Sequence, residues 1–218
     1  MQVQSAVMRQ AIRSTPMSPA SEPDIRLVGA MRSYDRDQEI FGEGEPADFI
    51  FKVASGAVRC FRILSDGRRQ ISDFYLPGEI FGVELDDEHR TAAEAVGEAA
   101  LVIARRASVL GDEAANSVAL WRKAAADLRR CRDHALTLGR RSAAERVAAF
   151  LLEMAERTGA VDVLDLPMSR QDIADYLGLT IETVSRTITG LQADGLIDAR
   201  CCRRIHLLDR EGLAELCE

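Results

Sequence analysis

The sequence has no long apolar run, and this absence limits what the chain can be. No stretch approaches the ~18 to 20 consecutive apolar residues that a membrane-spanning helix needs. The first twenty residues are rich in Met, Gln, Ser and Pro and hold no continuous apolar segment, which is not the pattern of a secretion signal. Residues 1–22 are therefore predicted to be a flexible tail, and we expect a cytoplasmic protein without a membrane partner.

Cysteine and histidine are too few and too scattered for a metal centre. The cysteines include no CxxC pair, and an odd number of them does not indicate a disulfide framework; they are Cys60, Cys131, Cys201, Cys202 and Cys217. A metal enzyme inside a β-barrel needs several converging histidines, and only His89 falls in the β-rich half. No Ser/His/Asp set, phosphate loop or acid–base pair is apparent, so we expect neither a metal nor an enzyme.

Positive charge is also scarce overall. Lys and Arg number 28 against 35 Asp and Glu, which gives a net charge of −7. Such a balance argues against a protein that coats nucleic acid by general electrostatic attraction, because that mode needs a clustered positive face. It is compatible with a local basic surface.

Residues 34–103 consist of short β-rich runs separated by glycine turns. The runs are 49–53, 58–64 and 70–75, and Ser65-Asp66-Gly67 between the last two is a hairpin signal. Turn signals every eight to twelve residues are typical of an antiparallel sandwich or barrel. With the helices predicted below for the C-terminal half, the fold class is α+β, and the sheet lies in the N-terminal half.

A long helix is predicted from about Glu113, because glycine and proline vanish while Ala, Leu and Arg dominate. Small and apolar residues recur at alternating steps of three and four along it, at Trp121, Ala124, Leu128, Cys131, Ala135 and Leu138. This set, here called the seam, has the period of a coiled coil. The seam favours self-association, with Cys131 in its core; the alternative is a helix that packs this stripe on its own sheet.

Three shorter helices follow, and their starts are marked by capping residues. Ser142 with Glu145 and Ser169 with Asp172 fit capping boxes, and Thr180 is placed to cap the third helix. Gly178-Leu179 forms the turn between the second and third helices. Two strands around a basic turn at 200–204 are expected at 196–208.

The third helix has two distinct faces. Its packed stripe is predicted to be Ile181, Val184, Ile188 and Leu191. Glu182, Ser185, Arg186 and Thr189 share another face. A short helix, a turn with glycine and a helix with a polar face form the helix-turn-helix pattern, whose second helix enters the major groove.

The polar face suits base recognition. Arg186 can donate two hydrogen bonds to guanine, Glu182 can accept from cytosine, and Ser185 can meet a base edge. We expect Glu182 also to hold the Arg186 guanidinium, four residues on. The predicted contacts to the DNA backbone are Ser169, Arg170, Thr180, Thr183, Arg200, Arg203 and Arg204. The alternative for Glu182 and Arg186 is a solvated ion pair, and for the whole chain a dimeric scaffold.

The segment SRQDIADYLGLTIETVSRTITGLQADGLI resembles the DNA-binding signature of the CRP/FNR family of bacterial transcription regulators, and Glu182-Thr-Val-Ser185-Arg186 is similar to its FNR and FixK branches. The resemblance covers nearly the whole chain. It implies a cyclic-nucleotide-binding-domain-like β-roll at 23–112, a dimerisation helix at 113–139 and a winged helix-turn-helix domain at 140–218. It further implies a homodimer on palindromic TTGAT/ATCAA-type sites, with RNA polymerase as a partner.

Two departures from the family pattern narrow the branch. No cysteine precedes Cys60, so the iron–sulfur ligand set of the oxygen sensors is missing. In the cyclic-nucleotide site Val83 follows Gly82 where the family has glutamate, and acidic residues that repel phosphate precede Arg90-Thr91-Ala92: Glu84, Asp86, Asp87 and Glu88. Pro77-Gly78-Glu79 is the alternative match to the ribose-binding pair.

The remaining match is to the FixK branch. This resemblance implies a regulator, mostly an activator, that acts without a cofactor or an effector on genes of low-oxygen respiration or nitrogen fixation. The alternative is a cyclic-nucleotide-dependent regulator of the same family. Cys201 and Cys202 lie between arginines, where positive charge favours the thiolate. Oxidation there is predicted to switch DNA binding off; alternatively, the two thiols only fill a hairpin turn.

Overall fold

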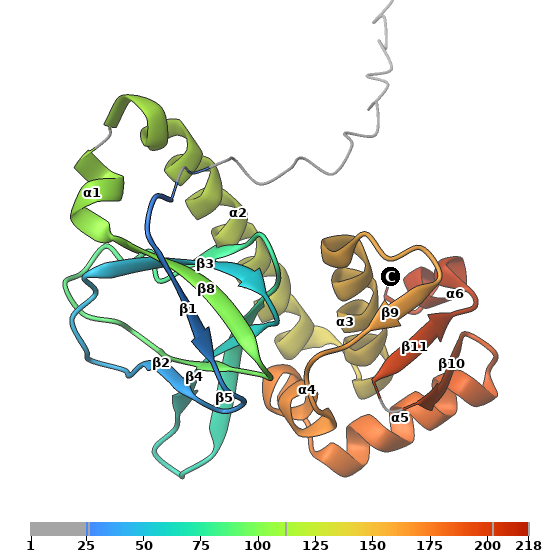
Figure 1. The fold of residues 1–218 in the computed structure, drawn as a ribbon. Helices are drawn as coiled ribbons and strands as arrows, with labels where there is room; N and C mark the ends of the chain where they lie inside the picture. The colour runs from blue at the N-terminus through green and yellow to red at the C-terminus, as the bar shows by residue number, and fades with distance from the viewer. Residues whose placement is uncertain (1–24, 26, 112, 202, 218) are drawn as a thin grey trace, which may run out of the picture.

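The computed structural model describes residues 25, 27–111, 113–201 and 203–217 and comprises a β-roll, a long helix and a C-terminal helical domain with a small sheet (Figure 1). The predicted tail at 1–22 and Cys202 lie outside the described residues, as do the side chains of Arg200 and Cys201. The redox prediction for the two cysteines therefore stays a prediction.

The β-roll consists of two four-stranded antiparallel sheets, as the turn spacing predicts. The strand orders are β1-β8-β3-β6 and β2-β7-β4-β5. Their bounds are β1 Ala30–Tyr34, β2 Glu39–Phe41, β3 Phe49–Ser55, β4 Val58–Ile63, β5 Arg69–Tyr75, β6 Ile80–Phe81, β7 Ala92–Ala95 and β8 Ala99–Arg105. Aromatic rings fill the space between the sheets, with Phe51 and Phe81 stacked at 5.1 Å between ring centroids.

The hairpin between β4 and β5 forms where the sequence predicts it. Gly67 has φ of 82°, a left-handed conformation that suits glycine, and its N–H donates to the carbonyl of Leu64 at 2.9 Å. The hairpin matters for function because β5 packs against the C-terminal domain.

Helix α1 (Arg106–Gly111) leads into α2 (Glu113–Arg140), a 28-residue helix about 42 Å long. The seam of α2 is not packed on the β-roll: Trp121 is 77% exposed and Leu128 is 52% exposed, and Cys131 is exposed too. The side turned inward is a different one and carries Lys123 and Thr137. The alternative that this stripe packs on its own sheet is therefore wrong, because that side of the helix points away from the β-roll. The prediction that Cys131 lies in the core of a seam between two chains stays a prediction.

The C-terminal domain contains α3 (Ala143–Thr158), β9 (Val163–Asp165), α4 (Arg170–Leu177), α5 (Ile181–Ala193), β10 (Ile197–Cys201), β11 (Arg204–Leu207) and α6 (Arg210–Glu215). The two predicted strands are β10 and β11, and β9 joins them in a sheet of order β10-β11-β9. Neither β9 nor α6 was expected from the sequence. The hydrophobic core lies between α3, α4, α5 and this sheet.

The predicted caps are present. Ser142 and Glu145 form the capping box of α3, Ser169 and Asp172 form that of α4, and the Thr180 hydroxyl accepts the N–H of Thr183. These local bonds satisfy donors that an uncapped helix start leaves unpaired. They fix where each helix begins and hence which side chains fall on its outer face.

One arginine joins the end of α2 to the C-terminal domain. Arg146 of α3 donates to the carbonyls of Leu138 (2.8 Å) and Arg141 (2.9 Å) at the end of α2, and to the carbonyl of Leu177 (2.9 Å) at the end of α4. One guanidinium thus occupies the carbonyl ends of two helices, where cations stabilise the unpaired acceptors.

Candidate nucleic-acid interface

Helices α4 and α5 pack together as a helix-turn-helix unit. The turn is made by Gly178, whose φ of 62° is left-handed. Val184, Ile188 and Leu191 are buried against the domain core, as their spacing predicts. Ile181 was predicted to belong to the same stripe, but it is 38% exposed. As the first residue of α5 it lies at the edge of the packed surface, so that prediction is wrong.

The predicted base-reading residues share an open face of α5. Glu182, Ser185 and Arg186 are all exposed, and the α5 helix runs along the outer side of its domain (Figure 1). The face is defined here by these three residues and is called the reading face. Nothing in the described β-roll covers them, so the side chains are free to meet a ligand in solution.

Glu182 does not hold Arg186 as expected. The pKa of Glu182 is lowered mainly by its own backbone N–H and by the Thr180 hydroxyl, and Arg186 adds a smaller attraction. Neither a hydrogen bond nor an ion pair joins the two side chains in the part of the chain that the structure describes. The reason is position: a carboxylate in the first turn is drawn to the unpaired N–H groups of the helix start.

The predicted backbone-contact residues differ in their hydrogen-bonding capacity. The Ser169 hydroxyl donates to Asp172 at 2.7 Å and also accepts its N–H, so its proton is committed to the cap. Thr180 and Thr183 are linked through their hydroxyls at 3.1 Å. Arg203 is exposed in the turn between β10 and β11. Arg204 is exposed as well and pairs with Asp165 at 2.8 Å.

Arg170 is the first residue of α4 and is half-buried, whereas the side chain of Arg200 lies outside the described residues. Ser169 at the start of α4 and Arg203 in the turn after β10 line one surface pocket, and Thr180 caps the start of α5, the helix that carries the reading face. When the second helix of such a unit enters the major groove, neighbouring groups of these kinds meet phosphates, and the assignment of these residues to the DNA backbone stays a prediction.

Other kinds of site find little support in the described ranges. They contain no group of three or more His, Cys, Asp or Glu side chains that could hold a metal ion. They also contain no helix with the length and apolarity needed to cross a membrane.

The residues without a clear signal in the sequence lie behind the reading face. Asp172, known from the sequence only as a cap, also accepts hydrogen bonds from Arg59 and Arg69 of the β-roll. The one hint is that Arg59 interrupts an otherwise apolar start of β4, in which Val58, Cys60 and Phe61 are buried. A charge at a buried strand position needs a partner.

Comparison with known proteins agrees with this arrangement. Residues 145–216 match the model of the Crp-like helix-turn-helix domain, and residues 31–116 match that of the cyclic nucleotide-binding domain. The nitrogen fixation regulation protein FixK of Rhizobium meliloti is 44% identical over 208 residues, which cover 95% of each chain. The transcriptional activatory protein AadR of Rhodopseudomonas palustris is 37% identical, over 83% of this chain and 79% of its own.

The structure of FixK2 from Bradyrhizobium japonicum superposes with a TM-score of 0.84 at 46% identity, and the match covers 88% of this chain and 98% of that one. These relatives are regulators of transcription rather than enzymes, as the sequence predicts, and the α+β architecture is the same. The chain therefore belongs to the CRP/FNR family of DNA-binding transcription regulators, and within it to the FixK-like branch.

Proposed function

We propose that the chain is a homodimeric activator that binds palindromic TTGAT/ATCAA-type sites and reads bases with Glu182, Ser185 and Arg186. The observation that carries this proposal is the reading face itself, three exposed side chains of complementary hydrogen-bonding type on one face of α5. Arg186 suits guanine, Glu182 suits the amino group of cytosine, and Ser185 suits either a base edge or a thymine methyl.

Dimerisation through α2 is supported by the seam. Trp121 and Leu128 expose large apolar surface in a single chain, and contiguous exposed apolar residues mark interaction surfaces. Pairing two such helices buries the seam and carries two copies of the reading face to one side of the molecule. Two copies can then meet half-sites about one helical turn, or ~34 Å, apart.

Action without an effector is supported by the β-roll interior. Phe41 stacks on His89 with 3.6 Å between ring centroids, and Phe41 lies 5.4 Å from Phe51. Arg90, the counterpart of the phosphate-binding arginine, is exposed and pairs with Asp86 at 2.5 Å. Glu79, the alternative ribose ligand, accepts hydrogen bonds from Arg157 at 2.7 and 3.0 Å. The groups that would hold a cyclic nucleotide are thus engaged elsewhere or replaced, so we propose that no cofactor or effector is needed.

The regulated process is proposed from the relatives. Two of the relatives are named nitrogen fixation regulation proteins. We propose that the targets are genes of nitrogen fixation or low-oxygen respiration. The chain would act in the cytoplasm, with RNA polymerase as its partner at the promoter.

Cys201 and Cys202 are proposed to add redox control in the turn after β10. The test is operator binding after peroxide treatment, measured for the wild-type chain and for the chain with Cys201→Ser and Cys202→Ser. An equal loss of binding in the two proteins means that these thiols are not responsible.

The direct test is binding of the purified chain to an inverted-repeat duplex with TTGAT and ATCAA half-sites, compared with a scrambled duplex at the same salt concentration. We expect two chains per duplex and clear preference for the repeat without added ligand. Calorimetric titration with cyclic AMP and cyclic GMP should give no binding. A monomer without sequence preference contradicts the proposal, and a nucleotide requirement favours the cyclic-nucleotide-dependent alternative.

A further inference from the structure

A buried arginine of the β-roll is bound to the DNA-binding domain. Arg59 of β4 is only 6% exposed. Its guanidinium donates to Glu94 at 2.6 and 3.1 Å and to Asp37 at 2.8 Å, both in the β-roll. Its remaining nitrogen, Nη1, donates to Oδ1 of Asp172 at 3.1 Å, across 113 residues of sequence.

Asp172 divides its two oxygens between two tasks. Oδ2 accepts the N–H of Ser169 at 3.0 Å and its hydroxyl at 2.7 Å, which completes the cap of α4. Oδ1 accepts from Arg59 and, at 2.7 Å, from Arg69 of β5. At 3% exposure Asp172 is shielded from water, so loss of these arginines would leave a buried carboxylate without its ion-pair partners. The start of α4, the first helix of the DNA-binding unit, is therefore held by the β-roll.

Arg69 strengthens the same joint. Its Nε donates to Asp175 of α4 at 2.8 Å while its Nη2 reaches Asp172. Two arginines from adjacent strands thus meet two carboxylates one turn apart on α4. Because guanidinium groups are planar and bind carboxylates with fixed geometry, this arrangement restricts both the position and the rotation of the helix.

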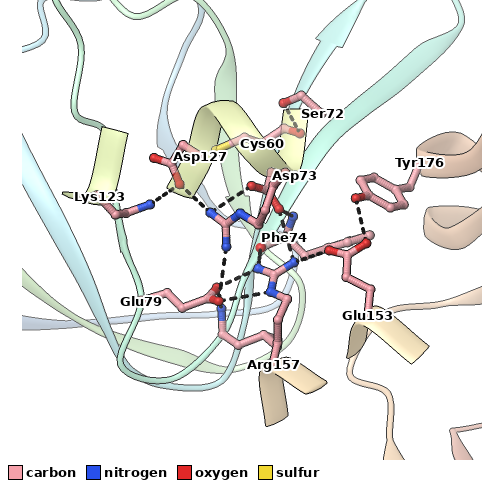
Figure 2. Close-up of polar contacts among 12 residues, drawn as sticks. Cys60, Ser72, Asp73, Phe74, Glu79, Lys123, Asp127, Glu153, Arg157 and Tyr176 are labelled. Atoms are coloured by element: carbon pink, nitrogen blue, oxygen red, sulfur yellow. Dashed lines mark hydrogen bonds and ion pairs between the residues drawn. The ribbon is translucent and has the colours of Figure 1, made fainter. Parts of the chain in front are cut away.

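A second ion cluster joins the domains at another point, shown in Figure 2. Arg157, near the end of α3, donates to Glu79 and to the backbone carbonyl of Phe74 in the β-roll. Burial alone would raise the pKa of Glu79, but the Arg157 bonds hold it below its ordinary value. Two charged joints at different helix ends resist rotation of one domain against the other better than a single joint does.

We propose that Arg59 is a positioning residue for DNA binding: by holding Asp172, it sets the orientation of the helix-turn-helix unit against the β-roll. The inference rests on the proposed function. In this arrangement the reading face on α5 is exposed, whereas the joint on α4 is buried where this helix packs against β5. The β-roll then contributes to operator affinity without touching DNA, and the effect acts through Asp172.

The test uses three variants of the full-length chain on the inverted-repeat duplex. Arg59→Met removes the guanidinium at similar volume, and Asp172→Asn weakens the ion pair while it keeps an oxygen for the cap. The double variant completes the cycle. We expect each single change to weaken operator binding about tenfold. The double variant should bind no more weakly than the single variant with the lower affinity, because the effects of changes at coupled residues do not add.

Controls separate positioning from general damage. Glu145→Gln removes the same charge from the capping box of α3, where the carboxylate contacts Ser142, and should keep wild-type affinity. Arg59→Lys retains one charge and should restore part of the affinity. All titrations are made at temperatures where circular dichroism finds each variant folded. The salt dependence should stay that of the wild type, since no phosphate contact is lost.

Wild-type or tighter binding by folded Arg59→Met overturns the inference, as does an equal loss in Glu145→Gln or simple additivity in the double variant. If Arg59→Met does not fold, Asp172→Asn and Arg59→Lys decide by the same criteria. If the wild type does not prefer the inverted-repeat duplex over the scrambled one, the result is a different one, because it contradicts the proposed function and not the role of Arg59.

Discussion

Phe74 of the β-roll and Phe150 of α3 meet edge to face, with ring centroids 6.4 Å apart and planes inclined at 63°. Tyr176 of α4 lies 5.4 Å from Phe74 and 5.7 Å from Phe150, and all three rings are buried. The hydrophobic core is therefore continuous from β5 into the DNA-binding domain. The charged joints lie around an apolar contact and do not replace it.

Phe74→Ala should test this continuity. Removal of a fully buried ring leaves a cavity and costs about 3–5 kcal/mol, and we expect the loss to lower the stability of both domains in one cooperative transition. Urea denaturation followed by circular dichroism measures it. Phe49→Ala, at a half-exposed ring of β3, is the control and should cost much less. A separate C-terminal transition unchanged by Phe74→Ala contradicts the prediction.

Arg186→Ala should cost about 1–3 kcal/mol at the specific site and relax selection at the guanine, because a bidentate base contact is lost. Competition titrations with duplexes substituted at each half-site position measure both effects. Gln192→Ala, at an exposed residue near the end of α5, should keep the affinity and the preference. An unchanged preference in Arg186→Ala means that another residue reads this base.

Arg203→Ala should behave differently. Its exposed guanidinium is expected to meet a phosphate, so its loss should weaken specific and scrambled duplexes alike and lower the salt slope by about one unit per copy. Titrations over a series of salt concentrations measure the slope. Loss of preference with an unchanged slope would assign Arg203 to base recognition instead.

Leu128→Glu should break the dimer. It introduces a charge at the centre of the seam, where two copies of α2 are proposed to meet. Sedimentation analysis without DNA measures the association state. Leu136→Glu is the matched control, since Leu136 is 63% exposed on the same helix but lies outside the seam. Dissociation in both variants, or in neither, argues against the seam as the interface.

Stability should fall on acidification, and His134 should contribute to the loss. Burial lowers the pKa of His134 from 6.5, while a backbone hydrogen bond to Tyr176 opposes this. The unfolded chain therefore takes up a proton first, and stability is lost as pH falls below about 6.5. The His134 ring stacks on the Tyr176 ring with 4.1 Å between centroids, and His134→Phe keeps a ring in this place without the titratable group. Denaturation at about pH 7 and about pH 5 should give a smaller loss in the variant; parallel losses exclude His134.

The parts of the structure that depend on near neighbours in sequence were predictable. The capping boxes at Ser142 and Ser169, the Thr180 cap and the Gly67 hairpin each arise from residues within a few positions, so the printed order contains the information. The resemblance to the family then supplied the arrangement of the parts. The reading face followed because helical periodicity alone places Glu182 and Arg186 on one side of α5.

Features that depend on distant residues were not predictable in this way. The bond from Arg59 to Asp172 joins positions 113 residues apart, and only the packing of β5 on α4 brings them together. Whether the stripe of α2 packs on its own sheet was also not predictable, because periodicity reports a stripe but not which way it points. The expected Glu182–Arg186 pair failed because the helix start competes for the carboxylate.

Arg146 connects the end of α2 with the end of α4, just before the turn that leads into α5. In a dimer, the number of residues in α2 therefore determines how each DNA-binding domain is rotated relative to the seam. One residue inserted between Leu128 and Leu138 would favour a turn of about 100° and a shift of about 1.5 Å in everything after it, and this turn would break the joints that hold the C-terminal domain to the β-roll. The two recognition helices would then no longer face the same side of the duplex, although every DNA-facing side chain was unchanged.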